Sequence, residues 1–301
     1  MSIFNVNEQT GTNNPFDGID VGYSSAPTFA DLDGDGDLDL IVGELDGNLN
    51  YFENTGSTTN PLYLAQTGTD NPFNSIDGEY STPTFADVDG DGDLDLIVGD
   101  LYEPLNYFEN TGTVTNPLYL AQTSTDNPFN GIDFGYLSAP TFADLDGDGD
   151  LYLIVGELDG NLYYFENTGS ATNPLYLAQT GTDNPFDGID VGNFSTPTFA
   201  DLDEDGALDL IVGESFGTLN YFEINRFDFV EQTGTNNPFD GIDVGYSSAP
   251  TFADLDGDGD LDLIVGELDG NLNYFENTGS TTYSLTAVKT VALVPMSRAL
   301  T

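Results

Sequence analysis

The sequence contains no cysteine and no histidine, and its only basic residues are Arg226, Lys289 and Arg298, against 53 acidic ones. Without cysteine, disulfides and thiolate metal sites are excluded. Without histidine, the chain lacks the most common general base and transition-metal ligand. Nucleic acids and anionic membrane surfaces are bound through lysine and arginine. A formal net charge of −50 therefore excludes both as partners.

Long apolar runs are also missing, so no transmembrane helix is predicted. The start, MSIFNVNEQT, shows neither the basic nor the apolar region of a signal peptide. What is present indicates a folded protein: hydrophobic residues make up 38% of the chain, with 21 Phe and 16 Tyr. Acidic disordered chains are poor in such residues. At 301 residues the chain is long enough to bury a large core.

Internal repetition dominates the sequence. The segment ADLDGDGDLDLIVGE (30–44) recurs four more times with small changes, at 86–100, 143–157, 200–214 and 253–267. Residues 8–59 recur unchanged as 231–282. The fourth repeat is shorter, because FENTGSTTNPLYL (52–64) is replaced by FEINRFDF (222–229), which indicates a tight turn. Self-similarity at a period of about 57 residues is typical of propellers and solenoids.

Each repeat contains four short apolar segments that we expect to be strands. In the first repeat they are APTFADL, LDLIVGE, NLNYFEN and PLYLAQT, and the turn LDGN between the second and third favours a hairpin. No long segment carries helical periodicity. The pattern predicts an all-β fold, a five-bladed β-propeller of four-stranded antiparallel blades over residues 1–282. Residues 283–301 are expected to be a tail, either a further strand or disordered.

The ends of the repeat array predict how the ring closes. The last full repeat stops after its third strand, whereas the chain begins with SIFNVNEQT, which matches a fourth strand. We expect Ile3–Gln9 to pair beside Leu272–Asn277 and complete the last blade. This pairing would remove an open sheet edge.

The aspartates between the first two strands predict a cation site. In D-L-D-G-D-G-D-L-D (31–39), alternate residues of a tight loop can turn their oxygens toward one ion. Several carboxylates and no nitrogen or sulfur ligands favour calcium over transition metals, and magnesium prefers fewer carboxylates. The loop is not an EF-hand, because Val42 stands at position 12, where an EF-hand has glutamate. A solvated acidic turn without metal is the alternative.

The segment FADLDGDGDLDLIVGELDGNLNYFENTG resembles the FG-GAP/VCBS repeat family, the integrin-α-type propeller blade with calcium in the loop between its first two strands. The resemblance covers nearly all of residues 1–282. It implies that calcium is bound by the side chains of Asp31, Asp33, Asp35 and Asp39, with Asp37 contributing its backbone carbonyl. Two further repeats match at every ligand position: Asp87, Asp89, Asp91, Asp93 and Asp95, and Asp254, Asp256, Asp258, Asp260 and Asp262.

Two repeats depart from the pattern. In the fourth, Ala207 takes the backbone-ligand position and Glu204 replaces a glycine, while the remaining ligands are Asp201, Asp203, Asp205 and Asp209. In the third, Tyr152 replaces the last aspartate and leaves Asp144, Asp146, Asp148 and Asp150. We expect up to five calcium ions, one in each repeat, with the third site the weakest or completed by water.

Two other features recur once per repeat. NPFDGID contributes Asp17 and Asp20, the second matched by Asp77, Asp133, Asp190 and Asp243. We interpret it as an Asx-type turn, with a ligand site as the alternative. Tyrosines recur in GYS (Tyr23, Tyr80, Tyr136, Tyr246, with Phe194 in place of one) and in NYFE (Tyr51, Tyr107, Tyr164, Tyr221, Tyr274). Most are expected to pack between blades, and a minority to line shallow grooves where a sugar ring could stack.

These features favour a non-catalytic, calcium-binding propeller that acts as a monomeric, extracellular binding or adhesion module. Its partner would be a glycan or an extracellular protein, and its location secreted or at the cell surface. One alternative is a purely structural repeat domain or a fragment of a larger adhesin. Another is a glycoside-acting enzyme with a carboxylate pair. An enzyme is disfavoured because a catalytic centre should be unique, and these repeats differ mainly by losses.

Overall fold

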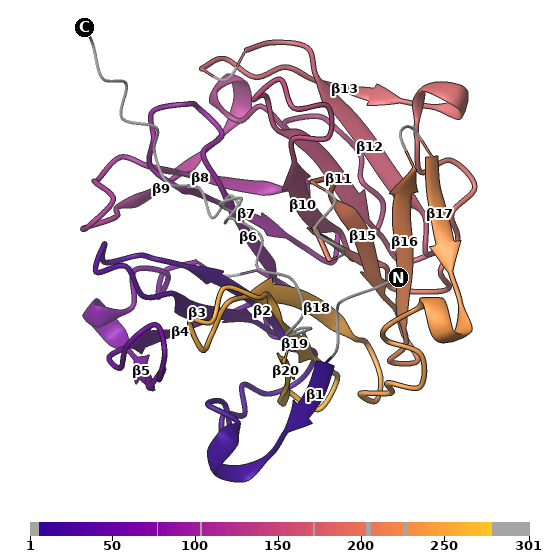
Figure 1. Ribbon diagram of the computed structural model, residues 1–301. Helices are drawn as coiled ribbons and strands as arrows, with labels where there is room; N and C mark the ends of the chain where they lie inside the picture. The colour runs from indigo at the N-terminus through magenta and orange to yellow at the C-terminus, as the bar shows by residue number, and fades with distance from the viewer. Residues whose placement is uncertain are drawn as a thin grey trace, which may run out of the picture.

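The computed structural model describes residues 6–76, 78–102, 104–170, 172–202, 206–225 and 228–278. These residues form five sheets of four antiparallel strands arranged around a ring (Figure 1). The predicted five-bladed β-propeller is therefore confirmed. No helix in the described part of the chain is long and apolar enough to span a membrane.

Within each blade the strands follow chain order from the ring centre outward. Blade 1 contains β2 (Ala26–Ala30), β3 (Asp39–Gly43), β4 (Leu49–Asn54) and β5 (Tyr63–Gln66). Blade 2 contains β6 (Thr82–Ala86), β7 (Asp95–Gly99), β8 (Asn106–Asn110) and β9 (Tyr119–Gln122). Blade 3 contains β10 (Ala139–Ala143), β11 (Tyr152–Gly156), β12 (Leu162–Asn167) and β13 (Tyr176–Gln179). Blade 4 contains β14 (Thr196–Ala200), β15 (Asp209–Gly213), β16 (Leu219–Asn225) and β17 (Asp228–Gln232).

Blade 5 is assembled from both ends of the repeat array. It contains β18 (Ala249–Ala253), β19 (Asp262–Gly266) and β20 (Leu272–Asn277). Its outer strand is β1 (Val6–Gln9), which runs antiparallel to β20 with Val6 opposite Asn277 (Figure 1). The predicted closure is confirmed for these residues. The rest of that prediction, residues 3–5, and the tail 283–301 lie outside the described residues.

The innermost strands of neighbouring blades contact each other all around the ring, and a serine joins each pair. The Ser81 hydroxyl of blade 2 accepts a hydrogen bond from the Glu44 amide of blade 1 and donates to the Asn48 carbonyl, both at 3.1 Å. Ser25 accepts from Glu267 in the same way at 2.8 Å, so the last blade is joined to the first. This approach is close because Gly43 has no side chain: a Cβ there would collide with the Ser81 carbonyl.

Apolar side chains fill the space between blades. The second strand of each blade, such as Asp39–Gly43, is buried along its whole length. The phenylalanine of each NPF segment lies between two blades: Phe73 is fully buried, with its ring 6.1 Å from Tyr51 of blade 1 and 5.2 Å from Tyr119 of blade 2. A short 3₁₀ helix precedes each NPF segment: η1 (Gly11–Asn13), η2 (Gly68–Asp70), η3 (Ser124–Asp126), η4 (Gly181–Asp183) and η5 (Gly234–Asn236).

The antiparallel strand order gives the ring two distinct faces. The aspartate loops follow the innermost strands, so they lie on one face, which we call the loop face. The segments that lead into the innermost strands, and the turns between the second and third strands, lie on the other, which we call the opposite face. Tyr23 and Asp31 thus stand at the two ends of β2 (Ala26–Ala30).

Candidate functional site

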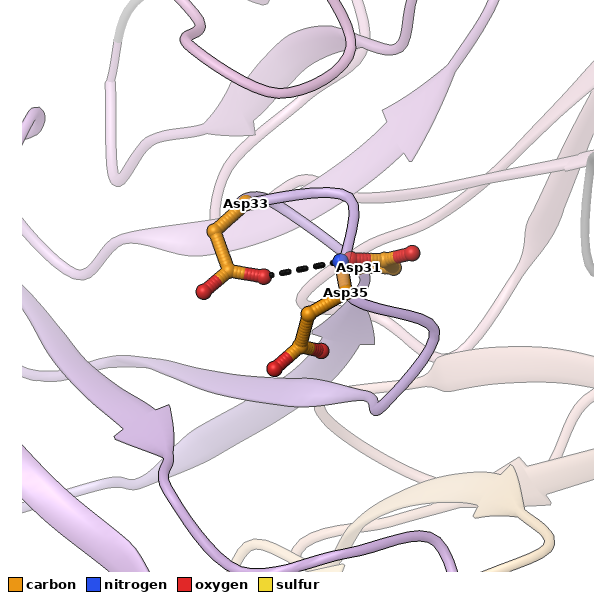
Figure 2. A group of neighbouring side chains, drawn as sticks. All are labelled: Asp31, Asp33 and Asp35. Atoms are coloured by element: carbon orange, nitrogen blue, oxygen red, sulfur yellow. Dashed lines mark hydrogen bonds between the residues drawn. The ribbon is translucent and has the colours of Figure 1, made fainter.

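The aspartate loops bring their first three carboxylates together. In blade 1, one oxygen each from Asp31, Asp33 and Asp35 lies within 4.8 Å of the others (Figure 2). The same spacing occurs in three further blades, with Asp87, Asp89 and Asp91, with Asp144, Asp146 and Asp148, and with Asp254, Asp256 and Asp258. A group of three carboxylate oxygens at this spacing can converge on one cation, as oxygen-ligated calcium requires.

Backbone amides hold each loop in this conformation. The Gly34 amide donates to Asp31 Oδ1 at 2.7 Å, and the Gly36 amide donates to Asp31 Oδ2 at 3.1 Å. The Asp35 amide donates to Asp33 Oδ1 at 3.1 Å, the bond drawn in Figure 2. Gly34 and Gly36 have φ values of 74° and 94°, in the left-handed region that favours glycine. The glycines and aspartates of the loop therefore determine its backbone conformation as well as its negative charge.

The electrostatics of the loops favour a bound cation. Burial, followed by repulsion from neighbouring carboxylates, raises the pKa of Asp89. Burial is also the main cause of a raised pKa at Asp33, Asp87, Asp254 and Asp256. In blade 2, Oδ1 of Asp87 is buried without a well-formed hydrogen bond. A cation would neutralise this charge and give the buried oxygen a partner, so the donor set fits calcium.

The last aspartate of the loop lies apart from the group of three. Asp39 begins β3 and is 1% exposed. Its Oδ2 accepts hydrogen bonds from the Tyr51 hydroxyl at 2.9 Å and the Leu32 amide at 3.3 Å, and its Oδ1 accepts from the Asn54 amide at 2.8 Å. Burial raises its pKa to about 6. Asp39 thus ties β3 to the end of β4, and its role as a calcium ligand stays a prediction.

The equivalents of Asp39 repeat this arrangement in other blades. Asp95 and Asp262 accept hydrogen bonds from Tyr107 at 2.8 Å and Tyr274 at 2.9 Å, and burial raises the pKa of each to about 7. Asp209 of blade 4 accepts from the Tyr221 hydroxyl at 3.0 Å. In the same blade, Asp201 accepts from the Gly206 amide at 3.0 Å. Asp203, Glu204 and Asp205 lie outside the described residues.

Blade 3 replaces the buried carboxylate with a phenol. Tyr152 is 6% exposed, and its hydroxyl donates a 2.9 Å hydrogen bond to Oδ2 of Asp146 in the aspartate loop. Its ring packs edge-on against Tyr164 with centroids 5.7 Å apart. In blade 3, the neutral hydroxyl of Tyr152 therefore donates to one carboxylate of the aspartate loop, that of Asp146. The expected weakness of the third site stays a prediction.

The opposite face carries a groove lined by amide side chains. It has a volume of about 480 Å³ and lies beside blade 1 and the segment that leads to blade 2. Tyr23 and Asp46 line it, together with Asn48, Asn50, Gln66, Asn71 and Asn74. Its size falls within the range of small-molecule sites.

The recurring tyrosines separate into buried and exposed sets. Those of NYFE are buried, as expected: Tyr51 is 7% exposed. The exposed minority that was expected consists of three tyrosines of the GYS group: Tyr23, Tyr136 and Tyr246 are 60%, 55% and 59% exposed. Tyr80 and Phe194 stand one residue later in their repeats than these three. They stack on each other with centroids 6.5 Å apart, although they precede non-adjacent blades, so they meet across the ring centre.

Exposed rings on the opposite face also form pairs. Tyr102 in the turn of blade 2 meets Tyr136 before blade 3, with centroids 5.8 Å apart. Phe216 in the turn of blade 4 meets Tyr246 before blade 5, with centroids 6.3 Å apart. At the equivalent junction after blade 1, these two positions hold Asp46 and Glu79.

Several acids that recur in the repeats have structural roles. Asp20 Oδ1 accepts from the Gly22 amide at 3.0 Å, an Asx turn, and Asp133, Asp190 and Asp243 repeat it, whereas Asp77 lies outside the described residues. Sequence reasoning missed Glu44, a buried carboxylate that accepts from the amides of Asp46 at 2.7 Å and Asn48 at 2.9 Å. Its signal was an acid after every IVG segment.

A comparison with known protein families agrees with the fold. An FG-GAP-like repeat matches residues 31–98, 87–155, 144–212 and 201–265. No curated protein matches the chain. Among solved structures, a lectin of Agrocybe aegerita that recognises non-reducing terminal N-acetylglucosamine is 19% identical, with a TM-score of 0.42 over 88% of this chain and 66% of that one. The Tc holotoxin pore of Photorhabdus luminescens is 18% identical, with a TM-score of 0.37 over 90% of this chain and 12% of that one.

Fold and loops together define a β-propeller whose blades each carry an aspartate loop on one face. The matched segments cover more than half of the chain, and the chain belongs to the FG-GAP repeat family. It spans 66% and 12% of the length of the two solved chains named above.

Proposed function

We propose that this protein is a non-catalytic, extracellular, calcium-stabilised propeller that binds neutral glycans on the face opposite its aspartate loops. The observation that carries the proposal is the groove beside blade 1, where an exposed tyrosine, Tyr23, lines the same groove as five amide side chains. Sugar rings stack on aromatic faces, and their hydroxyls pair with amides and carboxylates. A neutral ligand suits a chain with a net charge of −50, which repels anionic sugars.

The distribution of differences between repeats supports this choice of face. The strands at the ring centre are nearly identical: APTFA alternates with TPTFA, and LIVG occurs in every blade. Exposed aromatic residues vary between repeats in the turns and lead-in segments of the opposite face, where Asp46 corresponds to Tyr102 and Phe216, and Tyr23 corresponds to Glu79 and Asn193. Structure alone would not require aromatic residues there, because exposed rings add little to folding. A binding role explains them.

Calcium has a structural role in this proposal. The aspartate loops and the groove lie at opposite ends of the innermost strands, so an ion in a loop is a full strand length from the ligand, roughly 17 Å. Binding of the ion to the folded form alone would raise stability by mass action. Extracellular calcium, at millimolar concentration, would fill even weak sites.

A glycan array of neutral and acidic sugars, screened in millimolar calcium, tests the proposal. We expect binding to neutral glycans that Tyr23→Ala abolishes. Leu64→Ala is the matched control, because Leu64 is 47% exposed on the outer strand of the same blade, away from the groove. Binding that survives Tyr23→Ala would move the site elsewhere. Absence of any glycan binding by folded, calcium-loaded protein would refute the proposal and favour a protein partner or a purely structural domain.

A further inference from the structure

In blades 1 and 2, the connection between the third and outer strands lies on the aspartate loop of the preceding blade. In blade 2 this connection spans residues 111–118, and Thr115 covers Gly34 of blade 1: a Cβ on Gly34 would collide with the Thr115 methyl group. In blade 1 it spans residues 55–62, and a Cβ on Gly257 of blade 5 would lie 2.7 Å from the Thr59 methyl group. Thr59 and Thr115 are equivalent in the two repeats. We call these connections capping turns.

The glycine under each capping turn holds the first carboxylate of its loop. The amides of Gly34 and Gly257 each donate a 2.7 Å hydrogen bond, to Asp31 and Asp254 respectively. The capping turn itself is well ordered by hydrogen bonds: Asn110 Oδ1 accepts from the amides of Gly112 at 3.1 Å and Leu118 at 2.9 Å. The contact therefore joins a fixed turn to the part of the loop that positions a carboxylate.

A cavity of about 200 Å³ lies beneath the capping turn of blade 1. Thr58, Pro61 and Tyr63 line it from blade 1, and Asp254 and Leu255 line it from the aspartate loop of blade 5. The Tyr63 side chain is 8% exposed, and its hydroxyl is buried without a hydrogen-bond partner. A buried, unpaired donor costs free energy unless it meets water or another acceptor. The cavity has room for such a water beside the Asp254 carboxylate.

The chain contains a natural comparison. Blade 4 has no capping turn, because only two residues separate β16 (Leu219–Asn225) from β17 (Asp228–Gln232). The loop that such a turn would cover belongs to blade 3. There a Cβ on Gly147, the equivalent of Gly34, would meet no atom of the described residues within 4 Å. The same loop has Tyr152 in place of its last aspartate. In this comparison, the uncovered loop of blade 3 is also one that has lost a ligand candidate.

We propose that each capping turn completes the calcium site of the preceding blade, so that the affinity of a loop is set by two blades rather than one. The inference rests on the proposed occupancy of the loops by calcium. The cap separates the loop backbone beside the first carboxylate from bulk solvent, and a lower local dielectric strengthens the attraction between carboxylate and cation. Thr59 and Thr115 act as positioning residues, because they contact the loop backbone rather than the ion.

Calcium titration by calorimetry of wild type and the Thr59→Ala/Thr115→Ala variant tests this inference. Both threonines are exposed, so the variant should fold normally. We expect the two covered sites, in blades 5 and 1, to weaken roughly tenfold, the low end for a change just outside a metal's ligands. The other sites should keep their affinities. Val114→Ala is the matched control, since Val114 is 41% exposed in the same capping turn and is not among the atoms nearest Gly34.

Two outcomes separate this inference from the proposed function. If wild type binds no calcium, the loops are not calcium sites and the proposed role of the ion is wrong. If wild type binds calcium and the double variant binds it equally well, the caps do not contribute and only this inference is wrong. A second variant repeats the test in the reverse direction: the capping turn 111–118 replaces the tight turn of blade 4 in a Tyr152→Asp background. We expect the blade 3 site to tighten relative to Tyr152→Asp alone, and an unchanged affinity would overturn the inference.

Discussion

The hydroxyl of Tyr152 donates a 2.9 Å hydrogen bond to Oδ2 of Asp146. The equivalent residue in blade 1, Asp39, instead accepts hydrogen bonds from the Tyr51 hydroxyl and the Asn54 amide. One position therefore contributes a neutral donor in one blade and a buried acid in another. Tyrosine satisfies a loop carboxylate without a cation, and aspartate adds charge that favours one. We therefore expect the loop of blade 3 to depend less on a bound ion than the loop of blade 1.

We expect Tyr152→Asp to add a calcium site to blade 3. The substitution restores the last aspartate of the loop, and it removes the hydrogen bond that occupies Asp146. Calorimetric titration should show one more calcium ion per chain, bound more weakly than those in blades 1 and 5 because no capping turn covers the loop of blade 3. Without calcium, the variant should melt at a lower temperature than wild type, since it gains an unneutralised acid in place of a packed ring.

Tyr152→Phe is the matched control for this experiment. It removes the hydrogen bond to Asp146 and keeps the ring that packs against Tyr164. It should leave the number of bound calcium ions unchanged. An unchanged stoichiometry in Tyr152→Asp as well would show that the last aspartate does not govern metal binding.

Stability of the calcium-free protein should rise as the pH falls from 8 to 5. Asp39, Asp95 and Asp262 have pKa values raised by burial to about 6, 7 and 7, from 3.8. A raised pKa means that the folded state binds more protons than the unfolded chain in this window. The stabilisation is fully present below 3.8 and is lost as the pH rises through 6 to 7. For Asp39 alone, the rise in pKa from 3.8 to about 6 corresponds to about 3 kcal/mol of folding free energy.

Melting curves in a chelator across this pH range measure the effect. The Asp39→Asn/Asp95→Asn/Asp262→Asn variant should lose much of the pH dependence, because its three buried groups no longer titrate. In calcium the trend should weaken or reverse, since protons compete with the ion for the loops. A calcium-free protein that becomes less stable toward pH 5 would contradict the assignment of these buried acids.

Ser81→Ala should destabilise the junction between blades 1 and 2. The Ser81 hydroxyl accepts from the Glu44 amide and donates to the Asn48 carbonyl, and it is 2% exposed. Its removal leaves buried backbone groups without partners, at a cost of roughly 1–3 kcal/mol. Chemical denaturation measures the loss. Ser170→Ala, at an exposed turn of blade 3, is the control and should change the free energy of unfolding by less than about 0.5 kcal/mol.

The fold could be predicted from sequence because its signals are local and repeated. Alternating apolar residues in APTFA and NYFE define the strands, and the orphan strand VNEQ defines the closure, so β1 pairs with β20 as expected. The strand signals occur in several copies, so a strand that is ambiguous in one repeat can be assigned from the others. Loop conformation was equally visible, because glycines at fixed positions permit the φ values of 74° and 94° seen at Gly34 and Gly36.

The candidate site was less predictable, because residues that look alike in sequence meet different surroundings. Asp35 and Asp39 both belong to an alternating run, yet Asp39 begins a strand and is buried under it. Tyr23 and Tyr80 look equivalent in sequence, but Tyr23 is the first residue after a glycine and Tyr80 is the second. That shift turns Tyr80 toward the ring centre and leaves Tyr23 exposed. Such differences depend on packing between blades, which no single repeat encodes.

Calcium should raise the melting temperature far more than magnesium at the same concentration. Each loop offers a crowded set of carboxylates, and calcium accepts six to eight oxygen ligands with flexible geometry, whereas magnesium demands an octahedron and keeps its waters. Melting curves in a chelator, in magnesium and in calcium, at matched ionic strength, separate site binding from general screening of the −50 charge. Equal effects of the two ions would show that they act as counterions and not as ligands of the loops. A calcium-specific rise that Asp33→Asn reduces in part would assign one share of the stabilisation to the blade 1 loop, because Asp33 is one of the three carboxylates that converge there.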